Sequence, residues 1–162
     1  MTDIPCSIDN CVSFLCEKAK KESASFTFLE AHELLKLSSY LNCMHLKAGE
    51  IIWEEGDPCG PMAFIVSGRL KIKKETEFKG KQAVVGIYGR GAIAGELCLL
   101  DGSPRPVSAE TMDPVDLLTL DHMNFEMLLG QEPDLGARLL KGMLLTVSTR
   151  LKQSFSRLTT FF

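Results

Sequence analysis

Histidine is sparse, and neither the histidines nor the cysteines have the spacing that is typical of metal sites. The 162 residues include three histidines and six cysteines, but neither an H-x-H pair nor a C-x-x-C pair. Metalloenzymes commonly take their ligands from such closely spaced pairs, so we expect no metal site and no enzyme built on one. A chain of this length needs no disulfide to fold, and we expect free thiols that pack as small apolar side chains. The cysteines are Cys6, Cys11, Cys16, Cys43, Cys59 and Cys98.

Long apolar runs and an excess of positive charge are also missing. No run approaches the roughly 18 apolar residues that a membrane-spanning helix needs. The N-terminal segment lacks a basic stretch followed by a long apolar one, so we expect no signal peptide. The net charge of −3 at pH 7 excludes a general attraction to nucleic acid. We therefore expect a cytoplasmic protein without membrane contact.

The first part of the chain, to about residue 44, has the apolar spacing of helices. Leucine and aromatic residues recur at steps of three and four and predict one helix face, with Ser25 or Thr27 as a possible N-cap. These residues are Phe28, Leu29, Leu34, Leu35, Leu37, Tyr40 and Leu41.

The middle of the chain, from about residue 45 to 120, has a β-rich pattern instead. Runs of β-forming residues predict strands at 50–53, 62–66, 69–73, 83–88 and 115–120. Glycine, proline and aspartate separate these runs, which favours an antiparallel sandwich or barrel. Leu70 and Ile72 alternate with charged residues, so we expect one solvent-exposed face on that strand.

The last part of the chain, from about residue 121, is predicted to be helical again. Asp121 is a plausible N-cap for a helix over 123–129 that Gly130 ends, and Pro133 begins a long final helix. Apolar residues of this helix follow heptad spacing, with Ser154 in one position, and indicate pairing with a second helix or packing on the chain's own strands. The apolar positions are Leu140, Leu144, Val147, Leu151, Leu158 and Phe161. The flanking Arg150, Lys152 and Arg157 are interpreted as solvated.

The segment Gly91–Ala109, GAIAGELCLLDGSPRPVSA, contains the clearest candidate site. Gly95 and Glu96 begin a short apolar helical turn, and Arg105 follows a turn after it. Amide groups at a helix N-terminus favour an anion, and an arginine can hold a phosphate with two hydrogen bonds. A glutamate can accept a hydrogen bond from a hydroxyl group. The segment therefore suits a ligand with one phosphate and a sugar hydroxyl.

This segment resembles the phosphate-binding cassette of the cyclic-nucleotide-binding domain family, which includes the catabolite activator protein and protein kinase A regulatory subunits. Three further segments resemble the family's strands and turns, at residues 46–52, 55–58 and 64–70. The resemblance implies a double-stranded β-helix (jelly-roll) barrel that is mainly β, with N-terminal helices and a long C-terminal helix. It implies three parts: an N-terminal helical extension at 1–27, the barrel domain with flanking helices at 28–132, and a lid or dimerisation helix at 133–162.

The resemblance also assigns roles within the cassette. Glu96 would hold the ribose 2′-hydroxyl together with the Gly95 backbone, and Arg105 would neutralise the phosphate. The amides of Leu97 and Cys98 would face the phosphate, and Pro106 and Val107 complete the expected ligand-binding residues. A simple ion pair between Glu96 and Arg105, without any ligand, is the alternative interpretation.

Pro106 departs from the family pattern, which has Ala, Ser or Thr there. Proline has no N–H to donate, so we expect one phosphate contact to be missing and binding to be weaker, unless Ser103 or Ser108 compensates. A serine or threonine at this position often accompanies cGMP binding in the family, so its absence favours cAMP.

The sequence therefore predicts a regulatory module that binds a cyclic nucleotide, cAMP in preference to cGMP, and signals as a homodimer through its last helix. One alternative is a protein–protein interaction module on the same fold without a ligand, and a less favoured one is a cupin-like enzyme. The family's helix-turn-helix DNA reader has no counterpart in the sequence, so we expect no DNA binding by this chain alone. Trp53 is expected in the core.

Overall fold

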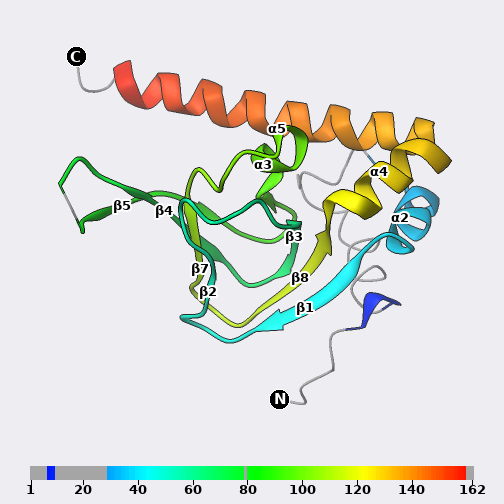
Figure 1. The fold of residues 1–162 in the computed structure, drawn as a ribbon, viewed down its shortest axis with the longest axis horizontal. Coiled ribbons are helices and arrows are strands. Elements are labelled where there is room, and N and C mark those ends of the chain that lie inside the picture. The colour runs from blue at the N-terminus through cyan, green and yellow to red at the C-terminus, as the bar shows by residue number, and fades with distance from the viewer. Residues whose placement is uncertain (1–6, 10–28, 79, 160–162) are drawn as a thin grey trace.

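The computed structural model describes residues 7–9, 29–78 and 80–159 (Figure 1). The helices are α2 (Ala31–Ser38), α3 (Glu96–Asp101), α4 (His122–Gln131) and α5 (Pro133–Thr159). The strands are β1 (Asn42–Leu46), β2 (Ile51–Trp53), β3 (Met62–Ser67), β4 (Leu70–Glu75), β5 (Gln82–Tyr88), β6 (Ile93–Ala94), β7 (Ser108–Thr111) and β8 (Val115–Leu120). Several sequence predictions lie outside the described residues: Cys6, Cys11, Cys16, Ser25, Thr27, Phe28, Phe161 and most of the extension at 1–27.

The strands form two antiparallel four-stranded sheets, as the strand pattern predicts. One sheet has the order β1-β8-β3-β6, and the other has the order β2-β7-β4-β5. Among the described residues the strand pairing gives two open sheets and no closed barrel, so the fold is mainly β with flanking helices.

Strand β3 is buried on both faces, and it contributes side chains to two separate hydrophobic cores. Met62, Phe64 and Val66 face a core that includes residues of α2, α4 and α5. The alternate residues Ala63 and Ile65 face a second core between the sheets. Successive side chains of a strand point to opposite faces, so this unbroken apolar run serves both cores.

Local sequence signals set most helix boundaries. The N-cap of α4 is Asp121, whose carboxylate accepts the amide of Asn124 at 2.8 Å, as predicted. Helix α5 begins at Pro133, also as predicted, because proline is preorganised for the first helical position. None of the helices in the described part of the chain is long and apolar enough to cross a membrane.

Three boundary predictions are wrong. The N-cap of α2 is Glu30, whose amide donates to Glu33 Oε2 at 2.8 Å, and neither Ser25 nor Thr27 has this role. The helical region does not reach residue 44, because β1 begins at Asn42 and pairs with β8. Gly130 does not end α4, which continues to Gln131.

The prediction of free thiols is also wrong for the three cysteines that lie in the described residues. Cys59 and Cys98 form a disulfide, with Cα atoms 5.6 Å apart and 39 residues between them in sequence. Cys43 is disulfide-bonded as well. The spacing of the cysteines in the sequence does not indicate this disulfide, because the pairing depends on the fold, which places α3 beside the β2–β3 connection.

Candidate functional site

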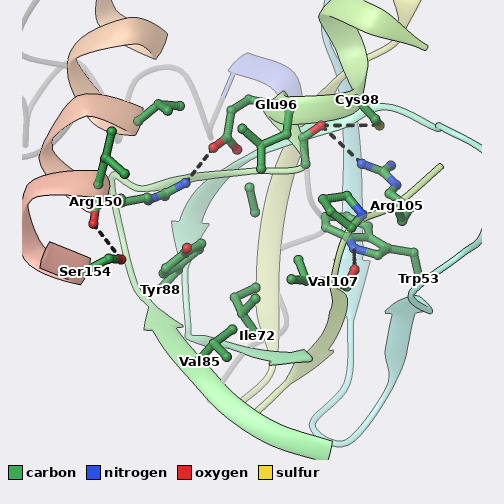
Figure 2. A pocket seen from close by; sticks show the side chains of 16 residues that line it. Trp53, Ile72, Val85, Tyr88, Glu96, Cys98, Arg105, Val107, Arg150 and Ser154 are labelled. Carbon is green, nitrogen blue, oxygen red and sulfur yellow. Dashed lines mark hydrogen bonds and ion pairs between the residues drawn. The ribbon is translucent and has the colours of Figure 1, made fainter. Parts of the chain in front are cut away.

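A cavity of about 270 Å³ lies between the β2-β7-β4-β5 sheet, α3 and α5 (Figure 2). Most of its wall is apolar, and its charged groups come from α3, from α5 and from the segment after α3. The lining residues include Trp53, Ile72, Val85, Tyr88, Gly95, Glu96, Leu97, Cys98, Arg105, Pro106, Val107, Val147, Arg150, Leu151 and Ser154. All seven predicted site residues therefore lie together around one cavity.

Arg105 is held in this wall by backbone groups and an aromatic ring. Its Nη1 donates to the carbonyl of Gly95 at 3.2 Å and its Nη2 to the carbonyl of Pro61 at 2.7 Å. Its guanidinium carbon lies 4.0 Å from the centre of the Trp53 ring. The indole N–H in turn donates to the carbonyl of Val107 at 3.0 Å, so the ring that supports Arg105 is itself fixed.

The hydrogen bonding of Arg105 is incomplete. The side chain is 3% exposed, and its Nε is the one buried side-chain nitrogen or oxygen in the described residues without a hydrogen-bond partner. Burial lowers the pKa of the guanidinium, while attraction to Asp57 and Glu96 acts in the opposite direction. A buried cation with a spare donor favours an anion beside it, because the anion would supply both the missing acceptor and the opposite charge.

Glycine at position 95 is required for this arrangement. Gly95 has φ +77°, a conformation that other residues rarely adopt. A Cβ there would lie 2.4 Å from Arg105 Nη1 and 3.1 Å from the Trp53 ring. The glycine therefore permits both the turn into α3 and the close approach of the guanidinium.

Glu96 is also buried, and its partner comes from the far end of the chain. Its Oε1 accepts a hydrogen bond from Arg150 Nη1 of α5 at 2.7 Å, while Arg150 Nη2 donates to the carbonyl of Ile93. The Arg150 guanidinium carbon lies 3.9 Å from the centre of the Tyr88 ring. Figure 2 shows this group across the cavity from Arg105 and Trp53.

The alternative of a Glu96–Arg105 ion pair is therefore wrong. Glu96 pairs with Arg150, whereas Arg105 bonds to two carbonyls. The interpretation of Arg150 as a solvated residue is wrong for the same reason. A local pattern could not have found this contact, because it joins residues 54 positions apart.

The remaining predicted residues are the first turn of α3 and the segment after Arg105. Leu97 and Cys98 lie in that first turn, where amide groups have no partner within the helix. Pro106 is exposed, and its carbonyl accepts a hydrogen bond from Lys74 Nζ at 3.0 Å. The carbonyl of Val107 accepts the indole N–H of Trp53.

The two serines that could replace the missing amide of residue 106 are already engaged. Ser108 Oγ accepts the amide of Glu55 at 2.8 Å, and Ser103 Oγ donates to Asp101 Oδ1 at 2.7 Å. Donation by Ser103 to a phosphate would break its bond to Asp101, whereas Ser108 only accepts here and keeps its O–H available as a donor.

Metal ligation has no geometric support in the described residues, where no three His, Cys, Asp or Glu side chains gather. His32 lies in α2, His122 in α4 and His45 in β1. His45 Nδ1 is 2.8 Å from Asp116 Oδ1, and these two groups form an exposed pair.

Comparison with known proteins identifies the domain. The family model described as "Cyclic nucleotide-binding domain" matches residues 43–132. A solved cyclic nucleotide-binding domain from Methylobacillus flagellatus has a TM-score of 0.84 and 27% identity, covering 97% of this chain and 87% of that chain.

Two curated relatives are longer regulators, and the match covers only a part of each. A cAMP-dependent protein kinase regulatory subunit of Emericella nidulans is 34% identical over 63% of this chain and 24% of its own length. A CRP-like cAMP-activated global transcriptional regulator of Mycobacterium tuberculosis is 26% identical over 72% of this chain and 51% of its own length. The chain thus spans about a quarter to a half of these curated relatives.

Proposed function

We propose, from the premise that the chain belongs to the cyclic nucleotide-binding domain family, that it is a regulatory module that binds cAMP in preference to cGMP. The family is one of ligand-binding regulatory domains, and we propose no catalytic activity. The observation that carries the proposal is Arg105, a buried cation whose Nε has no partner among the described residues.

The phosphate of the nucleotide would bind beside Arg105 and the first turn of α3. Arg105 Nε would donate to a phosphate oxygen, while Nη1 and Nη2 keep their carbonyl partners. The amides of Leu97 and Cys98 would face the same group. This arrangement gives the ligand a charge partner without moving Arg105 from Trp53.

The ribose and the base would occupy the rest of the cavity. Glu96, with the backbone of Gly95, would accept the 2′-hydroxyl, and Arg150 would keep the carboxylate in position. The apolar wall of Ile72, Val85 and Val107 suits the faces of a purine. Pro106 supports cAMP over cGMP, because it replaces the serine or threonine that the family resemblance links to cGMP.

We propose a cytoplasmic module with a jelly-roll arrangement of its two sheets, the domain limits 1–27, 28–132 and 133–162, and an output through α5. We propose a homodimer through that helix and no DNA binding by this chain alone. The 2.7 Å contact of Arg150 with Glu96 supports the output route, since it connects the ligand site to α5.

Calorimetric titration of the protein with cAMP and with cGMP tests the proposal. Arg105→Ala should weaken cAMP binding by about a hundredfold, because charge-assisted hydrogen bonds are worth roughly 1.5–3 kcal/mol each. Arg69→Ala is the matched control, since Arg69 pairs with Asp113 outside the cavity and is exposed. Circular dichroism establishes that each variant is folded.

Equal cAMP affinity in the wild type and Arg105→Ala would contradict the assignment of the phosphate site. If neither nucleotide binds the wild type at millimolar concentration, the nucleotide function is wrong. The interaction module without a ligand would then become the better description.

A further inference from the structure

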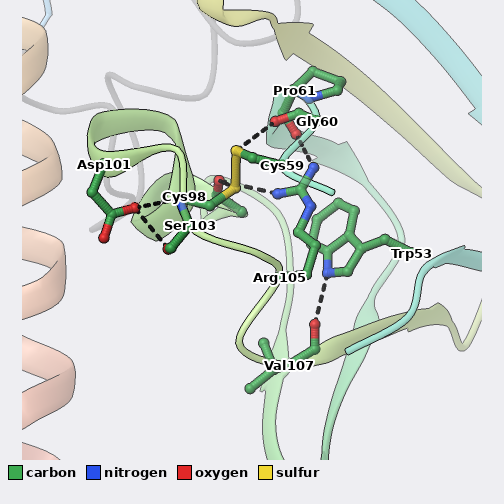
Figure 3. Close-up of a disulfide and its surroundings, with 10 residues drawn as sticks. Trp53, Cys59, Gly60, Pro61, Cys98, Asp101, Ser103, Arg105 and Val107 are labelled. Carbon is green, nitrogen blue, oxygen red and sulfur yellow. Dashed lines mark hydrogen bonds between the residues drawn. A yellow bond between two sulfur atoms is a disulfide. The ribbon is translucent and has the colours of Figure 1, made fainter. Parts of the chain in front are cut away.

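The Cys59–Cys98 disulfide joins the two segments that hold Arg105 (Figure 3). Cys59 lies two residues before Pro61, whose carbonyl accepts Arg105 Nη2. Cys98 lies in α3, three residues after Gly95, whose carbonyl accepts Nη1. The bond thus connects the two halves of the carbonyl cradle around the guanidinium.

The cradle tolerates little movement because it is built from backbone in close contact with Arg105. A Cβ on Gly60 would lie 3.1 Å from Nη2, and one on Gly95 would lie 2.4 Å from Nη1. The cradle therefore fits the guanidinium closely on both sides. A covalent link between these segments limits how far the two carbonyls can separate.

We propose that this disulfide is a redox-controlled clamp on the phosphate site, and that its reduction lowers nucleotide affinity. The inference rests on the proposed function. In the oxidised protein the cradle is preorganised around Arg105, so binding costs less ordering. In the reduced protein α3 and the β2–β3 connection are joined only by non-covalent contacts, and the site must be ordered by the ligand.

A cellular dithiol is the chemical class of reductant that this clamp needs. Cys98 is 1% exposed, whereas Cys59 is half-buried, so attack occurs at Cys59 Sγ. A thiolate of the dithiol bonds to Cys59 Sγ, the Sγ–Sγ bond breaks, and Cys98 leaves as a thiolate that takes up a proton. The second thiol then releases Cys59, so two electrons pass from the dithiol to the protein and the dithiol becomes a disulfide.

Linkage makes this coupling reciprocal. If the oxidised form binds the nucleotide tenfold more tightly, bound nucleotide must make the disulfide tenfold harder to reduce. For a two-electron couple, a tenfold change corresponds to a midpoint potential lower by about 30 mV.

The experiment compares Cys59→Ser, which removes only this bridge, with Cys43→Ser, which removes the disulfide at β1 and leaves the cavity residues intact. Affinity for cAMP is measured by calorimetry, and hydrogen exchange of residues 95–105 is measured by mass spectrometry without nucleotide. We expect Cys59→Ser to bind at least tenfold more weakly and to exchange faster over 95–105. Cys43→Ser should match the wild type within twofold until dithiothreitol is added, and then behave like Cys59→Ser.

Cyclic AMP affinity that is the same with the bridge intact, reduced or removed overturns the proposal. Equal exchange of residues 95–105 in oxidised and reduced protein overturns it as well, whether or not a nucleotide binds. If no form binds cAMP or cGMP, the proposed function fails separately. Faster exchange on reduction then still supports the clamp itself.

Discussion

Arg105 shows how a single side chain can connect stability with ligand binding. Leaving a buried donor without a partner costs free energy, of the order of 1–3 kcal/mol. The Trp53 ring and the two carbonyls offset part of the cost of burying the charge, but none of them serves Nε. An anionic ligand would recover this cost on binding, so the same feature that weakens the protein alone favours the complex.

Pro106 is the residue through which affinity can be raised. We expect Pro106→Ala to increase cAMP affinity by about tenfold, because it restores one amide donor beside the phosphate. Pro104→Ala is the matched control, since this exposed proline lies on the other side of Arg105 and its replacement adds no donor at position 106. The measurement is calorimetric titration of both variants with cAMP. Unchanged affinity in Pro106→Ala would show that the amide at this position does not reach the ligand.

Which site residues the sequence could predict depends on their separation along the chain. Gly95, Glu96 and Arg105 fall within one short segment, so their spacing in the sequence is enough to indicate a phosphate and hydroxyl site. The structure places all three around one cavity. Arg150 reaches the site only because α5 passes α3, as in Figure 1, and Cys59 meets Cys98 only through the packing of α3. No local pattern encodes such contacts, and both were assigned wrongly.

At the scale of elements, patterns with strong local causes were predicted well. The five predicted strands correspond to β2, β3, β4, β5 and β8, because alternation and turn residues mark them. Strand β1 was missed because its residues, NCMHL, lack the branched apolar pattern of the others. It becomes a strand through pairing with β8, a contact between distant parts of the chain.

Helix α5 contacts the ligand site directly, because its Arg150 donates a hydrogen bond to Glu96. We expect cAMP to change hydrogen exchange over residues 147–158 in the wild type, and this change to be lost in Arg150→Ala. Without the guanidinium, α5 no longer contacts the group that holds the ribose. The measurement is exchange of α5 with and without saturating cAMP, followed by mass spectrometry.

Arg157→Ala provides the control for that experiment. Arg157 lies on the same helix and donates to the carbonyl of Val85, but it does not contact Glu96. It should keep the nucleotide-dependent change. If Arg150→Ala also keeps the change, then α5 receives the signal through other contacts, such as those of Leu151 or Val147 with the cavity.

At the scale of the whole molecule, α5 is covered by the core for only part of its length. Leu135, Leu139 and Met143 are buried in the core that also contains residues of α2, α4 and β3. Beyond them, the helix exposes a set of large apolar side chains at heptad-like spacing. Those that are more than half exposed are Leu144, Leu145, Leu151, Phe155 and Leu158. Of the predicted seam, Leu144, Leu151 and Leu158 are exposed, while Val147 and Leu151 also line the cavity, so the domain covers the seam only in part.

Exposed apolar surface of this kind usually marks a contact site. The simplest way to bury these apolar side chains is against α5 of a second copy of the chain. Two-fold pairing is the commonest symmetry, and heptad spacing suits helix pairing. In a two-fold dimer, a change at Leu151 is present twice near the axis. One substitution should then place two like charges in an apolar seam, where neither is well solvated.

We expect the wild type to be a dimer at micromolar concentration, which corresponds to an association free energy of about 8 kcal/mol. Leu151→Glu should give monomers, because the paired charges oppose an association of this strength. Leu35→Glu, at an exposed leucine of α2, is the matched control and should leave the dimer intact. Analytical ultracentrifugation of the three proteins measures the mass directly. A wild type that sediments as a monomer at about 50 µM would exclude the dimer, and the stripe would then have to bind a different partner.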